Sequence, residues 1–96
     1  MDPKSTEALN EYASVAIIAE QYSQGLAALD KVRALGKESP GNLFYRALAQ
    51  DHLQMRLEAI DSYEKFLAAG QGKFPDQEFQ ARQRVRILQA ELKKKR

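Results

Sequence analysis

The single histidine of the chain, His52, is the first residue to consider for chemistry. Metal binding and acid–base catalysis both need several suitable side chains that converge on one point, and the sequence around His52 offers only Asp51 as a partner. The chain contains no cysteine, which excludes disulfides and thiolate zinc sites. We therefore predict no metal, no cofactor and no catalytic site, and we expect His52 to pack or to line a binding groove.

Two other patterns resemble chemical motifs but have simpler interpretations. Carboxylate pairs such as Glu7 and Glu11 occur at helical spacing, as they do on ordinary solvated helix faces. The run Gly70-Gln71-Gly72-Lys73 looks faintly like a phosphate-binding loop, but no strand precedes it and the full P-loop spacing is missing. We interpret this run as a helix stop. The sequence thus predicts a protein that is not an enzyme.

Proline, glycine and capping residues divide the chain into helices. A capping residue followed by proline, as in Asp2-Pro3 and Ser39-Pro40, marks the starts of the first and third helices. Ser23 is the expected cap of the second helix. No stretch alternates polar and apolar residues over the length of a strand, so the sequence predicts an all-α fold. The five helices are expected at about residues 3–20, 23–36, 39–54, 57–69 and 75–96.

Length and composition indicate one small globular domain over residues 1–96. The chain is 44% hydrophobic and 29% charged, which is ordinary for a folded protein. No apolar run approaches the roughly 20 residues of a membrane span. The absence of cysteine and of a signal segment favours the cytoplasm, unless the chain is a piece of a larger exported protein.

The chain repeats itself at an interval of 34 residues. Sliding it by that interval aligns the first two helices with the next two, and small residues fall on small ones and apolar residues on apolar ones. The aligned pairs are Leu9 with Leu43, Ala13 with Ala47, Gly25 with Ala59, Leu26 with Ile60, Leu29 with Tyr63, Asp30 with Glu64, Lys31 with Lys65 and Val32 with Phe66.

This period and pattern resemble the tetratricopeptide repeat, a helix–turn–helix of 34 residues with small residues where its helices cross. The resemblance implies two such repeats, over about 5–38 and 39–73, and a basic capping helix over 74–96, together a five-helix fragment of an α-solenoid. Strict spacing puts Arg46 and Gln50 where the family has large apolar residues. The alternative registration slides the third helix by two residues, to Tyr45, Leu48, Ala49 and His52.

The resemblance also implies a non-catalytic module for protein–protein interaction, a scaffold or adaptor that binds a peptide or helix in its concave groove. Asn10 is expected to hydrogen-bond an extended peptide, and Phe44 and Leu48 to take an apolar side chain. Ser14 and Leu48 stand where chaperone-binding members carry asparagines, which excludes that subtype. The groove-facing positions are Asn10, Ser14, Ile17, Phe44, Leu48, Asp51 and His52.

Positive charge is concentrated at the end of the chain. Residues 74–96 hold seven bases and three acids, although the net charge is only +2. Cations near a helix C-terminus favourably offset its dipole, and the alternative is a surface for nucleic acid or an anionic membrane. The lack of interleaved aromatic residues argues against nucleic acid. A third alternative is a homo-oligomer. The basic residues are Arg82, Arg84, Arg86, Lys93, Lys94, Lys95 and Arg96.

Overall fold

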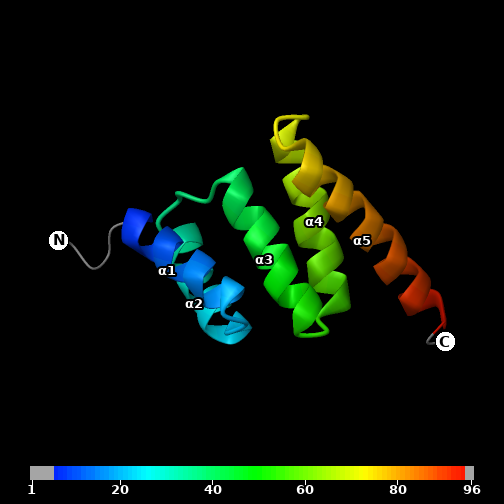
Figure 1. Cartoon of the computed structure of the whole chain (residues 1–96), viewed down its shortest axis with the longest axis horizontal. Helices are drawn as coiled ribbons and strands as arrows, with labels where there is room; N and C mark the ends of the chain where they lie inside the picture. The colour runs from blue at the N-terminus through cyan, green and yellow to red at the C-terminus, as the bar shows by residue number, and fades with distance from the viewer. Residues whose placement is uncertain (1–5, 95–96) are drawn as a thin grey trace.

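The computed structural model describes residues 6–94, which form helices and no strand (Figure 1). The all-α prediction is therefore confirmed for this part of the chain. The Asp2-Pro3 cap and the last two cations, Lys95 and Arg96, lie outside the described residues. The five helices are α1 Thr6–Ile18, α2 Tyr22–Ala34, α3 Pro40–His52, α4 Arg56–Gly70 and α5 Pro75–Lys94.

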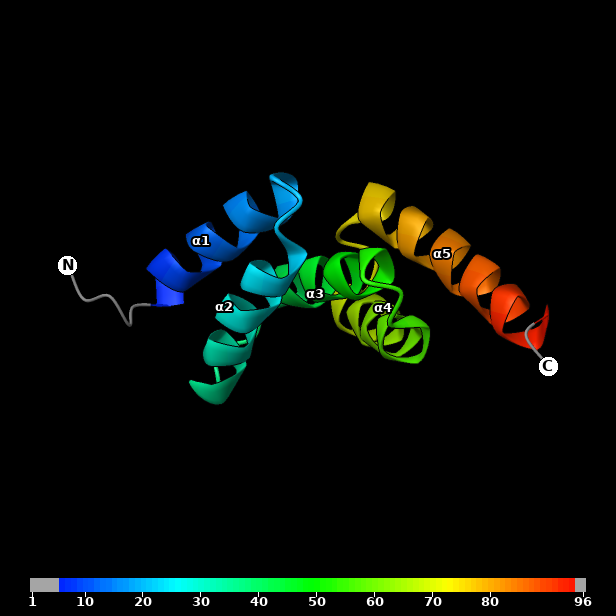
Figure 2. The same ribbon diagram turned by 90° about the horizontal axis from the view of Figure 1, so that it is seen from below.

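Consecutive helices pack against one another in chain order, and α1 also contacts α3. The array extends over 48 Å, with α1 and α2 at one end and α5 at the other (Figure 1). Viewed from below, α1 and α5 lie on one side of α3, whereas α2 and α4 lie towards the other (Figure 2). The fold is thus a row of helical hairpins with two distinct faces. None of the described helices is long and apolar enough to cross a bilayer.

The start of α3 follows the predicted cap. Ser39 has extended backbone angles, and its hydroxyl accepts a hydrogen bond from the Asn42 amide at 3.3 Å. The Asn42 side chain in turn accepts from the Ser39 amide at 2.8 Å, which completes a reciprocal capping box. The cap predicted for α2 is wrong: α2 begins at Tyr22, so Ser23 lies inside its first turn.

The turn between the two helices of each hairpin needs no serine cap, and its backbone angles recur at the 34-residue interval. Two residues after the end of α1 and of α3 the backbone has a positive φ, at Glu20 (65°) and at Gln54 (66°), which are 34 positions apart. The next residues, Gln21 and Met55, also have matching backbone angles and start the following helix without a side-chain cap. A left-handed residue satisfies the last carbonyl groups of the first helix, so the chain reverses without a serine.

The helix bounds follow the strict spacing of 34 residues, since α3 Pro40–His52 begins and ends 34 positions after α1 Thr6–Ile18. Ala13 and its counterpart Ala47 are both buried, at 1% and 0% exposure. Arg46 and Gln50 are also buried, at 4% and 8%, although the family pattern would place apolar residues there. They tolerate burial because they are hydrogen-bonded.

The core divides into two clusters of unequal size. The larger cluster lies between α3, α4 and α5 and is built around Phe44, Tyr63 and Phe66. The smaller cluster joins α1 and α2 to Ala49 of α3, and Gly25 lets α2 approach Ile17 of α1 closely. Burial of each large apolar side chain contributes about 1.5–3 kcal/mol, so the second hairpin holds most of the apolar stabilisation.

Candidate binding site

A pocket of about 380 Å³ opens where α3, α4 and α5 meet. Three of the predicted groove residues line it, together with one residue of the predicted basic surface and one core tyrosine. Neither the spacing along α3 nor that along α5 reveals the pocket by itself, because it forms only when α5 folds back beside α3. Its lining residues are Leu48, Asp51, His52, Gln54, Tyr63, Gln80 and Arg84.

The pocket contains an ion pair with a hydrogen-bonded phenol. Arg84 binds Asp51 through two parallel hydrogen bonds, from Nε to Oδ2 at 2.7 Å and from Nη2 to Oδ1 at 2.8 Å. The hydroxyl of Tyr63 donates to Asp51 Oδ2 at 2.9 Å. Paired hydrogen bonds of this kind hold both side chains in a defined orientation. Arg84 therefore ties α5 to α3, instead of standing free on a basic surface.

The protonation states of this trio follow from its contacts. Burial raises the pKa of Asp51, but hydrogen bonds from Arg84 and Tyr63 and the charge of Arg84 outweigh it, so the pKa lies below the ordinary 3.8. Burial and the neighbouring carboxylate raise the pKa of Tyr63. The hydrogen bonds to Asp51 raise the pKa of Arg84. At neutral pH the pocket thus holds a fixed carboxylate, a fixed guanidinium and a neutral phenol.

His52 lies at the rim of the pocket and is exposed. Its ring stacks on Tyr22 of α2, with centroids 4.5 Å apart and planes 12° from parallel. Its Nδ1 lies 2.9 Å from the carbonyl oxygen of Leu48, and since a carbonyl can only accept, Nδ1 carries the proton. The stacked pair gives the pocket an aromatic edge.

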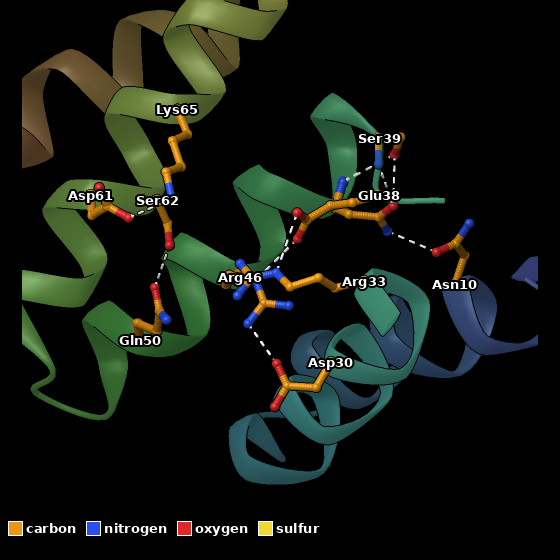
Figure 3. Close-up of polar contacts among 11 residues, drawn as sticks. Asn10, Asp30, Arg33, Glu38, Ser39, Arg46, Gln50, Asp61, Ser62 and Lys65 are labelled. Atoms are coloured by element: carbon orange, nitrogen blue, oxygen red, sulfur yellow. Dashed lines mark hydrogen bonds and ion pairs between the residues drawn. The ribbon is translucent and has the colours of Figure 1, made fainter. Parts of the chain in front are cut away.

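The remaining predicted groove residues do not join this pocket. Asn10 accepts a hydrogen bond from Asn42 at 2.7 Å, so its amide links α1 to α3 (Figure 3). Ser14 donates to the backbone oxygen of Asn10 at 2.7 Å. Ile17 and Phe44 are 5% and 8% exposed and belong to the core. They share the inward stripes of their helices with the small residues at the helix crossings, which is why they cannot face a ligand.

A second groove, of about 400 Å³, lies between α2 and α4 on the other face of the molecule. Near it, Arg46 donates to Asp30 at 2.7 Å and to Glu38 at 3.3 Å (Figure 3). Its Nη2 atom is buried and has no hydrogen-bond partner among the described residues. Sequence analysis placed no site here. The groove residues are Arg33, Gln50, Leu57, Glu58, Asp61, Ser62 and Lys65.

Backbone amides of the loop before α5 bind a carboxylate of the protein itself. The amides of Gly72 and Phe74 donate to the two carboxylate oxygens of Glu78, at 3.1 and 3.0 Å. α4 ends at Gly70, and Gln71 and Gly72 follow with positive φ, as the helix-stop interpretation requires. The amides that could cradle a phosphate are thus occupied by a side chain of the protein.

The rest of the predicted basic surface is exposed and unpaired as far as the structure describes it. Glu91, the acid closest to the end of α5, pairs with Arg56 at 3.0 Å and neutralises none of these cations. Among residues 6–94 no cluster of three or more histidine, aspartate or glutamate side chains could hold a metal ion. The exposed cations of this group are Arg82, Arg86, Lys93 and Lys94.

No protein family, curated protein or solved structure matches the chain.

Proposed function

We propose that the chain is a tetratricopeptide-like, non-catalytic interaction module that binds an extended segment of a partner protein in the α3–α5 pocket. The observation that carries the proposal is the lining of this pocket. Leu48 offers an apolar contact, the His52–Tyr22 stack offers an aromatic one, and the amides of Gln54 and Gln80 can hydrogen-bond a peptide backbone.

The electrostatics of the pocket support binding over catalysis. The carboxylate of Asp51 accepts hydrogen bonds from Arg84 and Tyr63, so it is not poised to take a proton from a substrate. Fixed side chains of this kind suit recognition, because a ligand that meets them loses little conformational entropy from the protein. The 34-residue recurrence of the Glu20 and Gln54 turns supports the resemblance to the tetratricopeptide repeat.

A selection from phage-displayed random peptides tests the proposal, with two variants of α5 as probes. Gln80→Arg puts a long cation into the pocket, whereas Gln89→Arg makes the same change at an exposed position of α5 outside it. Peptides selected on the wild type should lose at least tenfold in affinity for Gln80→Arg and keep it for Gln89→Arg. Equal binding to both variants, or no enriched peptide, would contradict the proposal.

The second candidate is an electrostatic binder of nucleic acid or an anionic surface through α5. The four exposed cations of the basic surface, which have no ion pair in the described part of the chain, favour it. Binding to phosphates releases counterions and therefore weakens steeply as salt rises. Fluorescence anisotropy with a labelled oligonucleotide measures how steeply the affinity falls with salt, and this slope reports the number of phosphate contacts. The double substitution Arg82→Ala/Arg86→Ala should lower that number by about two. Binding that ignores salt or these cations would exclude this candidate.

A further inference from the structure

Each end helix of the array carries an apolar stripe that no described helix covers. On α1, Tyr12, Val15 and Ile18 recur at intervals of three and are 52%, 61% and 72% exposed. On α5, Phe79 and Ile87 lie about two helical turns apart and are 58% and 42% exposed. Burial of apolar surface yields about 25 cal/mol per Å², so contact between such stripes is favourable.

The charges beside the two stripes are opposite in sign. α1 carries two acids, Glu7 and Glu11, both exposed, and its sequence contains no base. Neither acid forms an ion pair within residues 6–94. The exposed side of α5 carries the unpaired cations described above, and Asp76 in its first turn is its one exposed acid. One end of the molecule is therefore acidic and apolar, and the other is basic and apolar.

We propose that the partner of these stripes is a second copy of the chain, bound head to tail, with α1 of one molecule against α5 of the next. A symmetric α1–α1 contact would bring Glu7 and Glu11 close to their own copies, and an α5–α5 contact would do the same for Arg86. The head-to-tail contact alone pairs opposite charges. α1 and α5 lie at opposite ends of the molecule, so a single copy cannot join them (Figure 1).

This arrangement goes beyond the proposed function, because none of the five stripe residues lines the α3–α5 pocket. A head-to-tail contact leaves one free stripe at each end of a dimer, so further copies can add and the assembly does not stop at two copies. A helix of 13 residues is only about 20 Å long, and the contact falls at or below the roughly 800 Å² per partner of a standard interface. We expect micromolar affinity that weakens as salt rises.

Complementation between two variants tests the proposal. Val15→Glu disables the α1 stripe and Ile87→Glu the α5 stripe, and both side chains are exposed enough to change without harm to the core. In analytical ultracentrifugation from micromolar to millimolar protein, the wild type should form dimers and longer species. Each variant alone should stay monomeric. An equimolar mixture should form dimers and nothing larger, because only one intact pair of stripes remains.

A third variant controls for the loss of an exposed apolar residue as such. Leu57 on α4 is 69% exposed and belongs to neither stripe, so Leu57→Glu should associate like the wild type. Circular dichroism confirms that each variant keeps its helices. A wild type that stays monomeric up to millimolar concentration would overturn the proposal. So would self-association of either stripe variant alone, or a mixture that fails to dimerise.

Discussion

The two sides of helix α3 are built from different chemistry. Towards α4 it presents Phe44, whose ring lies 5.1 Å from Phe66 and 6.4 Å from Tyr63. Towards the first hairpin it presents the small, fully buried Ala49 and the charged Arg46, which pairs with acids from outside α3. The first contact excludes water from a broad apolar surface, whereas the second places a charge in a nearly dry site.

This difference assigns the two contacts different physical roles. Aromatic burial supplies free energy and tolerates small shifts of the helices, because dispersion and apolar burial are not directional. A buried guanidinium adds little net stability, since its desolvation cost offsets the attraction of its partners. Its hydrogen bonds are satisfied in few arrangements, however. We therefore expect the aromatic side to hold the fold together and the ionic side to set how the hairpins sit against each other.

The largest effect is expected for Phe66→Ala. Phe66 is 1% exposed and contacts the rings of Phe44 and Phe74, so its removal leaves a cavity and should cost about 3–5 kcal/mol. Urea unfolding followed by circular dichroism measures this cost. The matched control is Phe79→Ala, which removes a 58% exposed ring and should change stability by less than about 0.5 kcal/mol at low protein concentration. Equal costs would refute the assignment of the core.

For the ionic side of α3, we predict that two substitutions differ in their cost to stability. Glu38→Ala leaves the buried Arg46 with Asp30 alone and should cost about 2–3 kcal/mol. Arg46→Met removes the charge together with the Nη2 atom, which has no hydrogen-bond partner among residues 6–94, and should cost less than Glu38→Ala. The same urea titrations compare them. If Arg46→Met proves the more damaging change, the ion pair contributes net stability and the assigned role is wrong.

The Asp51–Arg84 pair predicts a dependence on pH. The folded pKa of Asp51 is depressed, so its contribution to stability is present above its unfolded pKa of about 4 and is lost as pH falls through the folded value. Asp51→Asn should therefore cost about 1–2 kcal/mol at pH 7. This cost is smaller than for a fully buried pair, because the side chain of Arg84 is a third exposed and water screens the attraction. Below about pH 4 the cost of the substitution should fall progressively. The measurement is the urea midpoint of both proteins at several pH values.

A surface pair provides the control for this prediction. Asp61 and Lys65 form an i,i+4 pair at 3.0 Å, with both side chains about 60% exposed. Asp61→Asn should change stability by about 0.5 kcal/mol or less, because water and salt screen the attraction. A cost for Asp51→Asn that does not diminish in acid would show that the carboxylate charge is not what the fold uses.

Local signals predicted the helices better than they predicted the site. Ser39-Pro40 predicted the start of α3, because a helix cap needs only neighbouring residues. The turns at Glu20 and Gln54 could not be predicted in the same way, since they adopt positive φ without a glycine. Leu48, Asp51 and His52, which the sequence predicted to face a groove, line one pocket. The role of Arg84 could not be predicted, because it depends on how α5 folds back on α3 and on a partner 33 residues away.

The smallest effect concerns the crossing of the two helices within each repeat, where the first repeat has Gly25 and the second has Ala59. Ala59 carries a Cβ atom at the α3–α4 crossing, whereas a Cβ atom on its counterpart Gly25 would lie 2.5 Å from Cγ1 of Ile17. In an open helix, glycine to alanine would stabilise by about 1 kcal/mol. Here Ile17 is 5% exposed and has little room to move, so the clash should exceed that gain, and Gly25→Ala should destabilise by about 1 kcal/mol.

The reciprocal change, Ala59→Gly, provides the comparison for this last prediction. It opens a small gap at a residue that is 0% exposed and relaxes the backbone of α4, for a cost of about 1 kcal/mol or slightly more. Thermal unfolding resolves both effects, since 1 kcal/mol corresponds to about 4–8 °C in a domain of this size. A higher melting temperature for Gly25→Ala would mean that the first hairpin can spread where the second cannot, and that its tight crossing is not required by the fold.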